Sequence, residues 1–240
     1  MWFPPSPVEP ACGTGGLLLS NPPFSTTMIP TTPGRLIAIE GIDGSGKTTL
    51  CRALADWLPS SGLMPPGAEL IATREPGGTP LGQELRRLLL NPLDGAAPCP
   101  RAELLLFAAD RAQHVETVIR PALEAGHWVL TDRFSGSTMA YQGHGRGVAQ
   151  PLVEAANALA ASVQPIDVTL WLYLPAEDAI RRRGARTDRM EADPEFLYRV
   201  AVGFSTLFCI NDWTRLNATQ PPEQVLAAAQ QALAERFGAP

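Results

Sequence analysis

The sequence predicts an α/β fold in which a five-stranded parallel sheet is flanked by helices on both faces. Short apolar runs alternate along the chain with longer segments of helical period. A glycine-rich turn joins the first such run to the first helical segment. The chain has 240 residues, of which 45% are hydrophobic, enough to build one substantial core. We therefore expect one α/β domain whose ligands bind at the carboxyl ends of the strands.

The elements are expected to follow one another as strand, helix, strand, helix. Strands are expected at 35–40, 70–73, 127–131, 168–174 and, more weakly, 214–217. Helices are expected at 47–58, 80–90, 101–124, 151–162, 176–183, 194–211 and 222–236. Pro80 falls in a first helical turn, where proline is favoured. Pro121 lies within 101–124 and predicts a kink or a restart of the helix.

Residues 1–33 have a different composition from the rest of the chain. They hold eight prolines mixed with Gly, Ser and Thr, and they show no apolar period. Such a segment cannot bury enough apolar surface to offset the entropy of ordering it. We expect 1–33 to be a disordered extension and 34–240 to be the folded domain. Met28, just ahead of the first strand, is an alternative start of the protein.

Charge and cysteine content limit the partners and the compartment. The formal net charge of −5 argues against a surface that coats nucleic acid. The four cysteines are widely spaced and form no CxxC pair, which is typical of a reduced cytoplasmic protein. No run approaches the roughly 18 apolar residues that a membrane span needs. We expect a cytoplasmic protein with no nucleic-acid or membrane partner.

The segment 41–49 matches the phosphate-binding pattern G-x-x-x-x-G-K-[ST] between a strand and a helix. Backbone N–H groups of such a loop form a nest for phosphate oxygens. Lys47, the single lysine of the chain, can reach the terminal phosphates, and the Thr48 hydroxyl can ligate Mg²⁺. A chance glycine-rich turn is the alternative. The pattern predicts a P-loop NTPase fold in which the triphosphate is bound by Gly41, Ile42, Asp43, Gly44, Ser45, Gly46, Lys47, Thr48 and Thr49.

Two further strands are followed by charged residues. Arg74 follows the second strand and precedes a Gly-Gly pair, so it can hold an anion close to the backbone. The alternative is a connecting turn with a surface arginine. Asp132 ends the third strand, where a P-loop fold places its second Mg²⁺ anchor, and Arg133 can grip a phosphoryl group. A helix cap is the alternative role for Asp132.

Two helical segments carry further candidates. Phe107 and Arg111 are four residues apart and share a helix face, which suits stacking on a nucleobase and hydrogen bonding to it. Taken alone, Phe107 is more readily explained as a core residue than as a platform for a base. The segment 181–189 holds five arginines in nine residues. In this fold it predicts a lid that stabilises transferring phosphates, the alternative being a solvated charged face.

Taken together, these stretches resemble the bacterial type of the thymidylate kinase family over about residues 35–236. The resemblance rests on the segments 39–48, 74–79, 132–134, 140–147 and 188–189. It implies transfer of the γ-phosphoryl group of ATP to dTMP, which gives dTDP and ADP for dTTP synthesis. It also implies Mg²⁺ as cofactor and a homodimer.

The resemblance also implies roles for single residues. Its substrate site would consist of Asp43, Arg74, Phe107, Arg111, Arg133, Thr138, Tyr141 and Gln142. Tyr141 would fill the space of a ribose 2′-hydroxyl, and Asn217 would lie in the adenine-side loop. Gly44 stands where one family type has a basic residue, so the lid (about 181–192) would supply the catalytic arginine. The implied catalytic residues are Lys47, Arg133, Arg183, Arg186 and Arg189.

Two rival functions fit the fold less well. A guanylate or cytidylate kinase shares it, but Tyr141 favours a deoxy-sugar, and the pair of Phe107 and Arg111 favours a pyrimidine. A regulatory ATPase or GTPase switch is the other rival. A guanine-reading Asn-Lys-x-Asp element is impossible here because the single lysine is Lys47.

Overall fold

The computed structural model describes residues 34–91, 97–161, 165–183 and 193–238. The expected extension 1–33 and most of the expected lid (184–192) lie outside these ranges. The sheet has five strands, which are β1 (Arg35–Glu40), β2 (Leu70–Arg74), β3 (Trp128–Asp132), β4 (Val168–Tyr173) and β5 (Thr214–Asn217). Their order is β2-β3-β1-β4-β5, and every neighbouring pair is parallel. The predicted five-stranded parallel sheet is therefore confirmed.

The register of the three strands β2, β3 and β1 brings their carboxyl ends together. Asp132 of β3 lies opposite Ile39 of β1 on one side and Arg74 of β2 on the other. Side chains that follow these three strands therefore gather at one edge of the sheet, where open α/β folds bind their ligands.

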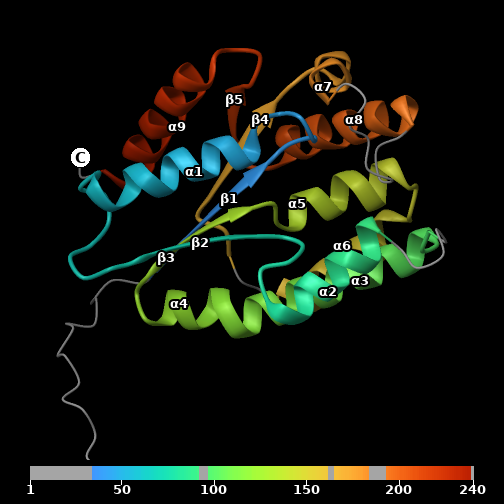
Figure 1. The fold of residues 1–240 in the computed structure, drawn as a ribbon, viewed down its shortest axis with the longest axis horizontal. Helices are drawn as coiled ribbons and strands as arrows, with labels where there is room; N and C mark the ends of the chain where they lie inside the picture. Colours follow the sequence, from blue (N-terminus) through green and yellow to red (C-terminus); the bar gives the residue numbers. More distant parts are fainter. Residues whose placement is uncertain (1–33, 92–96, 162–164, 184–192, 239–240) are drawn as a thin grey trace, which may run out of the picture.

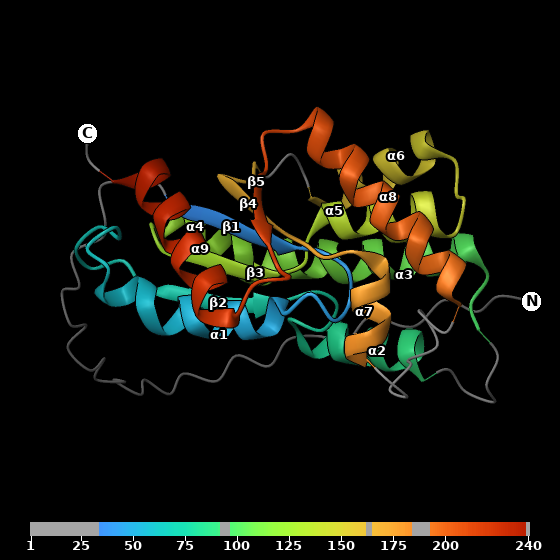
Figure 2. The same cartoon turned by 90° about the horizontal axis from the view of Figure 1, so that it is seen from above.

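Alternate residues of β1 pack against helices on opposite faces of the sheet. Leu36 and Ala38 contact a π-helical segment (Val115–Ile119), which leads into α4 (Arg120–Glu124). Ile37 and Ile39 belong to the cluster built by α1 (Lys47–Trp57) and α9 (Pro222–Phe237). Figure 1 shows α1 and α9 on one side of the strands and α4 on the other, and Figure 2 shows α1 and α9 side by side.

The remaining helices agree closely with the sequence-based expectation. They are α2 (Pro80–Leu90), α3 (Pro100–His114), α6 (Gln150–Ala161), α7 (Ala176–Arg183) and α8 (Pro194–Ile210), and a short 3-10 turn (Leu58–Ser60) ends α1. The expected helix 101–124 changes type twice, and α4 begins with Pro121 in its first turn. This change of helix type agrees with the restart expected at Pro121.

The sequence did not predict α5 (Ser135–Thr138) or the π-helical segment Met139–Gly145 that continues it. The segment 135–145 is rich in glycine and small polar residues, which are weak helix formers. Tertiary packing compensates, because the ring of Tyr141 lies 6.0 Å from Phe196 and 6.2 Å from Phe204 of α8. Gly145 allows the close approach, since a Cβ there would lie 2.5 Å from the Phe196 ring.

Candidate active site

The phosphate-binding loop follows β1 directly and is shaped by glycines. Gly41, Gly44 and Gly46 have φ values of 144°, 83° and 95°, which side-chain-bearing residues rarely adopt. Lys47, the first residue of α1, is buried, and its Nζ donates to the Ile42 carbonyl (2.9 Å) and to Asp43 Oδ1 (3.1 Å). The lysine is thus held beneath the loop at a helix N-terminus, the arrangement that binds phosphate groups.

A pair of oxygen ligands lies beside the loop. Thr48 Oγ1 donates to Asp132 Oδ2 at 2.8 Å, and the buried Asp132 Oδ1 has no hydrogen-bond partner among the described residues. Asp132 does not cap α5, because that helix begins at Ser135 with Phe134 in the cap position. The described ranges hold no cluster of three or more His, Cys, Asp or Glu residues suited to a metal. A hydroxyl and a carboxylate with a spare oxygen fit a cation that keeps most of its waters, as Mg²⁺ does.

A cavity lies beside the phosphate loop, between α2, α3 and the 135–145 segment. Seven of the eight expected substrate residues line it, namely Asp43, Phe107, Arg111, Arg133, Thr138, Tyr141 and Gln142. Arg74, the eighth, lines the adjoining cavity together with Lys47 and Thr48. The two cavities share Asp43 and Arg133, so they adjoin at the phosphate loop.

Three guanidinium groups converge where the two cavities meet. Arg133, which has φ 77°, donates from Nη1 to the Gly41 carbonyl (3.1 Å) and to Ser137 Oγ (3.0 Å), and from Nη2 to the Asp43 carboxylate. Arg86 of α2 is half-buried, and burial, followed by the charges of Arg74 and Arg133, lowers the pKa of its guanidinium. Arginine stays charged despite such a shift, so this corner concentrates positive charge and suits an anionic group.

Arg111 is almost completely buried, yet it lines the cavity. Its Nε donates to Glu75 Oε2 (2.8 Å), and its Nη1 donates to Thr138 Oγ1 (2.9 Å) and Asn157 Oδ1 (2.7 Å). Nη2 makes no hydrogen bond within the described part of the chain. Phe107 lines the same cavity and is only partly buried, so it is not a core residue. A planar ligand beside Phe107 would meet a fixed hydrogen-bond donor at its edge.

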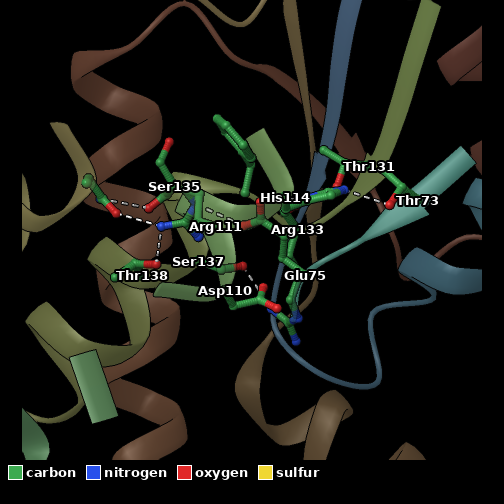
Figure 3. A network of polar contacts seen from close by, with 12 residues as sticks. Thr73, Glu75, Asp110, Arg111, His114, Thr131, Arg133, Ser135, Ser137 and Thr138 are labelled. Carbon is green, nitrogen blue, oxygen red and sulfur yellow. Dashed lines mark hydrogen bonds and ion pairs between the residues drawn. The ribbon is translucent and has the colours of Figure 1, made fainter. Parts of the chain in front are cut away.

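A second buried group of polar residues supports Arg111 from behind. His114 Nδ1 lies 2.9 Å from Glu75 Oε1, and its Nε2 lies 2.7 Å from Thr73 Oγ1 (Figure 3). Asp110 Oδ1 accepts the Gly77 N–H (3.0 Å), which ties α3 to the loop after β2. Burial, and then the charge of Glu75, raise the pKa of Asp110 to about 6. Asp110 Oδ2 is buried and has no partner among the residues described.

Gln142 and Tyr141 complete the cavity. Gln142 is buried, its Nε2 donates to Glu103 Oε1 (3.0 Å), and its own Oε1 makes no hydrogen bond in the described ranges. The Tyr141 hydroxyl accepts from the Asp43 N–H (3.2 Å) and from Arg133 Nη2 (3.3 Å). Tyr141 thus holds the phosphate loop against the arginine corner.

On the opposite side of the phosphate loop lies another cavity, lined in part by Gly46, Thr49, Arg182 and Ala218. Arg182 Nη2 donates to the Ala218 carbonyl at 2.8 Å. The side chain of Asn217 shapes the turn after β5 that contains Ala218. Its Oδ1 accepts from the Thr219 N–H (3.1 Å) and hydroxyl (2.8 Å). Of the lid candidates, Arg186 and Arg189 lie outside the described residues, as does the side chain of Arg183.

Sequence reasoning missed several residues that build this site. Arg86 lies next to Arg87 in α2, and nothing local distinguishes the arginine that borders the cavity from the one that pairs with the exposed Glu84. Glu40, at the end of β1, is buried and accepts from the Phe134 N–H (3.0 Å) and from Ser137 Oγ (2.5 Å). Burial raises the pKa of Glu40, which the Ser137 hydrogen bond and the charge of Arg133 oppose. For Glu40, the one feature of the sequence that could have indicated this role is its position directly before the glycine-rich loop.

Comparisons with known proteins agree with this geometry. A family model described as thymidylate kinase matches residues 39–229. The thymidylate kinase of Parasynechococcus marenigrum (strain WH8102) is 55% identical over 208 residues, which cover 85% of this chain and 99% of that protein. That of Synechococcus sp. (strain RCC307) is 57% identical over 205 residues, covering 84% of this chain and 96% of that protein. Within the described ranges, no helix is long and apolar enough to cross a membrane. The chain belongs to the thymidylate kinase family.

Proposed function

We propose that this phosphotransferase moves the γ-phosphoryl group of ATP onto dTMP, giving dTDP and ADP. The observation that carries the proposal is the cavity beside the phosphate loop. It combines a fixed donor and a fixed acceptor at one end with three arginines at the other. A nucleoside monophosphate has the complementary shape, with a base at one end and a phosphate at the other.

The hydrogen-bonding pattern of the cavity supports thymine as the base. Arg111 Nη2 can only donate, and the Gln142 amide, because its nitrogen faces Glu103, turns its carbonyl oxygen toward the ligand. Thymine offers a carbonyl oxygen at C4 and an N–H at N3, which match this pair. Cytosine carries an amino group and a bare nitrogen at the same positions, so it would leave buried groups unpaired. Phe107 lies where it would stack on the base.

In the proposed reaction, an oxygen of the dTMP phosphate attacks the γ-phosphorus of ATP, and the bond from that phosphorus to the β–γ bridging oxygen breaks. The acceptor is already an anion, so no strong general base is needed. Arg74, Arg86 and Arg133 would hold the acceptor phosphate, while Lys47 and the loop N–H groups would hold the donor phosphates. Arg183, Arg186 and Arg189 are proposed to close over the transferring group and exclude water.

Mg²⁺ is proposed to bind at Thr48 and Asp132. The buried Asp132 Oδ1, which has no partner among the described residues, supports this placement. When bound, Mg²⁺ would neutralise charge on the donor phosphates. EDTA should abolish turnover, and added MgCl₂ should restore it. Turnover that persists in EDTA would contradict a role for the metal.

The experiment that tests the substrate is a coupled ADP-release assay with dTMP, dUMP, dCMP, dGMP and UMP. The highest kcat/KM is expected for dTMP, and a lower one for dGMP, whose two-ring base is larger than the pyrimidine proposed for this site. A preference for any other nucleotide would overturn the proposed substrate.

A homodimer in the cytoplasm completes the proposal. Leu105 of α3 and Leu159 of α6 are 64% and 83% exposed, and these two helices pack side by side. Exposed apolar side chains on two adjacent helices suit self-association. Light scattering on the purified chain should give twice the monomer mass, and Leu105→Glu combined with Leu159→Glu should give the monomer mass.

A further inference from the structure

Glu103 of α3 is a buried carboxylate that lies behind the base end of the cavity. It is 1% exposed, and its Oε1 accepts from both Gln142 Nε2 and Arg146 Nε, each at 3.0 Å. Gln142 and Arg146 are four residues apart on the π-helical segment and its continuation, so they reach the same carboxylate. Glu103 therefore connects the base-binding helix to the segment that carries Gln142.

The chemistry of this contact determines the orientation of the Gln142 amide. A carboxylate paired with a guanidinium offers acceptors and no donor. The amide must then direct its NH₂ group toward Glu103, which leaves its carbonyl oxygen for the cavity that Gln142 lines. The reversed amide would place two oxygens against each other in a buried site and would lose a charge-assisted hydrogen bond.

Arg146 pairs with Glu103 and holds the carboxylate in position. The Arg146 guanidinium lies over the ring of Phe196 with its Cζ 4.2 Å from the ring centroid, and Phe196 is itself buried on α8. This stacking fixes the cation that pairs with Glu103, since cation–π contacts hold a planar guanidinium in one orientation. The order of contacts is Phe196, Arg146, Glu103 and Gln142.

We infer that Glu103 is a specificity-determining positioning residue, which sets the Gln142 amide so that it accepts from the ligand and thereby selects a base with an N–H at ring position 3. The inference rests on the proposed function, because it deepens the account of the same base site. Glu103 does not touch the ligand and acts through Gln142.

The test compares dTMP with 5-methyl-dCMP, which keeps the methyl group of thymine and changes only the hydrogen-bonding edge. In Glu103→Gln, the new amide can donate or accept, so Gln142 is no longer held in one orientation. The ratio of kcat/KM for dTMP to that for 5-methyl-dCMP should fall about 10- to 100-fold, mainly through a higher KM for dTMP. Glu235→Gln is the matched control, since exposed Glu235 likewise accepts from a glutamine, Gln231 (2.8 Å), on α9. Its ratio should equal that of the unmodified chain.

Introducing Glu103→Gln into a Gln142→Met variant tests whether Glu103 acts by positioning Gln142 or by supporting the structure in general. If Glu103 acts through Gln142, Glu103→Gln should not change the ratio further once Gln142 is absent. Glu103→Asp covers the case in which Glu103→Gln does not fold. The shorter aspartate should hold Gln142 less well, so the KM for dTMP should rise. Because aspartate still only accepts hydrogen bonds, the ratio of kcat/KM for dTMP to that for 5-methyl-dCMP should stay within about threefold of the original.

The outcomes distinguish the inference from the function on which it rests. An unmodified chain that does not prefer dTMP contradicts the proposed function. An unmodified chain that prefers dTMP, together with a folded Glu103→Gln variant that discriminates equally well, overturns the inference about Glu103. The inference about Glu103 is also overturned if Glu103→Asp lowers the ratio of kcat/KM for dTMP to that for 5-methyl-dCMP as much as Gln142→Met does.

Discussion

The part of the site proposed to hold dTMP, here the acceptor side, differs from the part proposed to hold ATP, here the donor side, in how firmly its functional side chains are held by buried partners. On the acceptor side, Arg111, Gln142 and Arg133 each hold hydrogen bonds to buried or half-buried partners. On the donor side, Ser45 Oγ and Asp132 Oδ1 are buried and have no partner within the described ranges. Buried polar groups of a native protein are normally satisfied, so unpaired ones indicate where a ligand or ion binds.

This difference indicates that the two sides achieve specificity and catalysis in different ways. On the acceptor side, the hydrogen bonds that hold Arg111 and Gln142 are already formed without a ligand, so these side chains would select the base as fixed hydrogen-bonding groups. The donor side would become complete with the triphosphate, the Mg²⁺ and the lid arginines that we propose for it. Substitutions on the acceptor side should therefore reduce stability together with specificity, whereas donor-side substitutions should reduce turnover and leave folding intact.

Lys47→Ala tests the donor side and should have the largest effect. Turnover should fall by about two to five orders of magnitude, because the ammonium would be lost from the transferring phosphates. The melting temperature should stay within a few degrees, since Asp43 keeps its ion pair with Arg133. ADP release and thermal unfolding measure the two effects. Arg52→Ala, in the same helix and exposed, is the control. Near-normal turnover in folded Lys47→Ala would contradict the role of the loop.

Arg111→Leu tests the acceptor side. It removes the guanidinium that pairs with Glu75 at 2.8 Å, where the two side chains are 2% and 3% exposed. The free energy of unfolding should fall by about 3–5 kcal/mol, because a buried carboxylate loses its charged partner. Denaturant unfolding measures this loss.

Arg87→Leu is the matched control for Arg111→Leu. It breaks the exposed pair with Glu84 and should cost less than about 1 kcal/mol. Equal losses of unfolding free energy in the two variants would mean that the buried pair of Arg111 and Glu75 does not stabilise the acceptor side more than an exposed pair would.

The same contrast explains what the sequence predicted well. The phosphate loop and the ends of β2 and β3 are local features, in which a strand, a turn and a charged residue follow one another in the chain. Thr48 and Asp132 were therefore identified from sequence, and the structure places them 2.8 Å apart. The strands and most helices were predicted for the same reason, since their periodicity is local.

The buried partners on the acceptor side were not predictable in this way. Asn157 contacts Arg111 across 46 positions of the chain, and Glu103 contacts Gln142 across 39. A lone Asn or Glu in an amphipathic helix has the same local signature whether it is buried or exposed. The helical segment 135–145 was missed because packing against α8 overrides its low helix propensity.

Asp110→Asn examines a buried carboxylate on the acceptor side whose Oδ2 has no partner among the described residues, and it should have the smallest effect. Because the pKa of Asp110 is raised to about 6, the folded protein binds this proton more tightly than the unfolded chain does. The ionised carboxylate therefore costs stability above about pH 6, and this cost disappears as the pH falls toward 4. Asparagine has the same shape, keeps an acceptor for the Gly77 N–H and carries no charge.

Asp110→Asn should thus be more stable than the unmodified chain by about 1–2 kcal/mol at pH 8, with a difference about a third as large at pH 4.5. Urea unfolding at pH 4.5, 6 and 8 measures the difference, and Asp56→Asn, exposed on α1, is the control that should show no such trend. A gain that is constant with pH would mean that relief of packing, and not of charge, is responsible. A loss of stability at pH 8 would mean that the ionised Asp110 stabilises the Gly77 loop, and its charge would then not be a cost to the folded acceptor side.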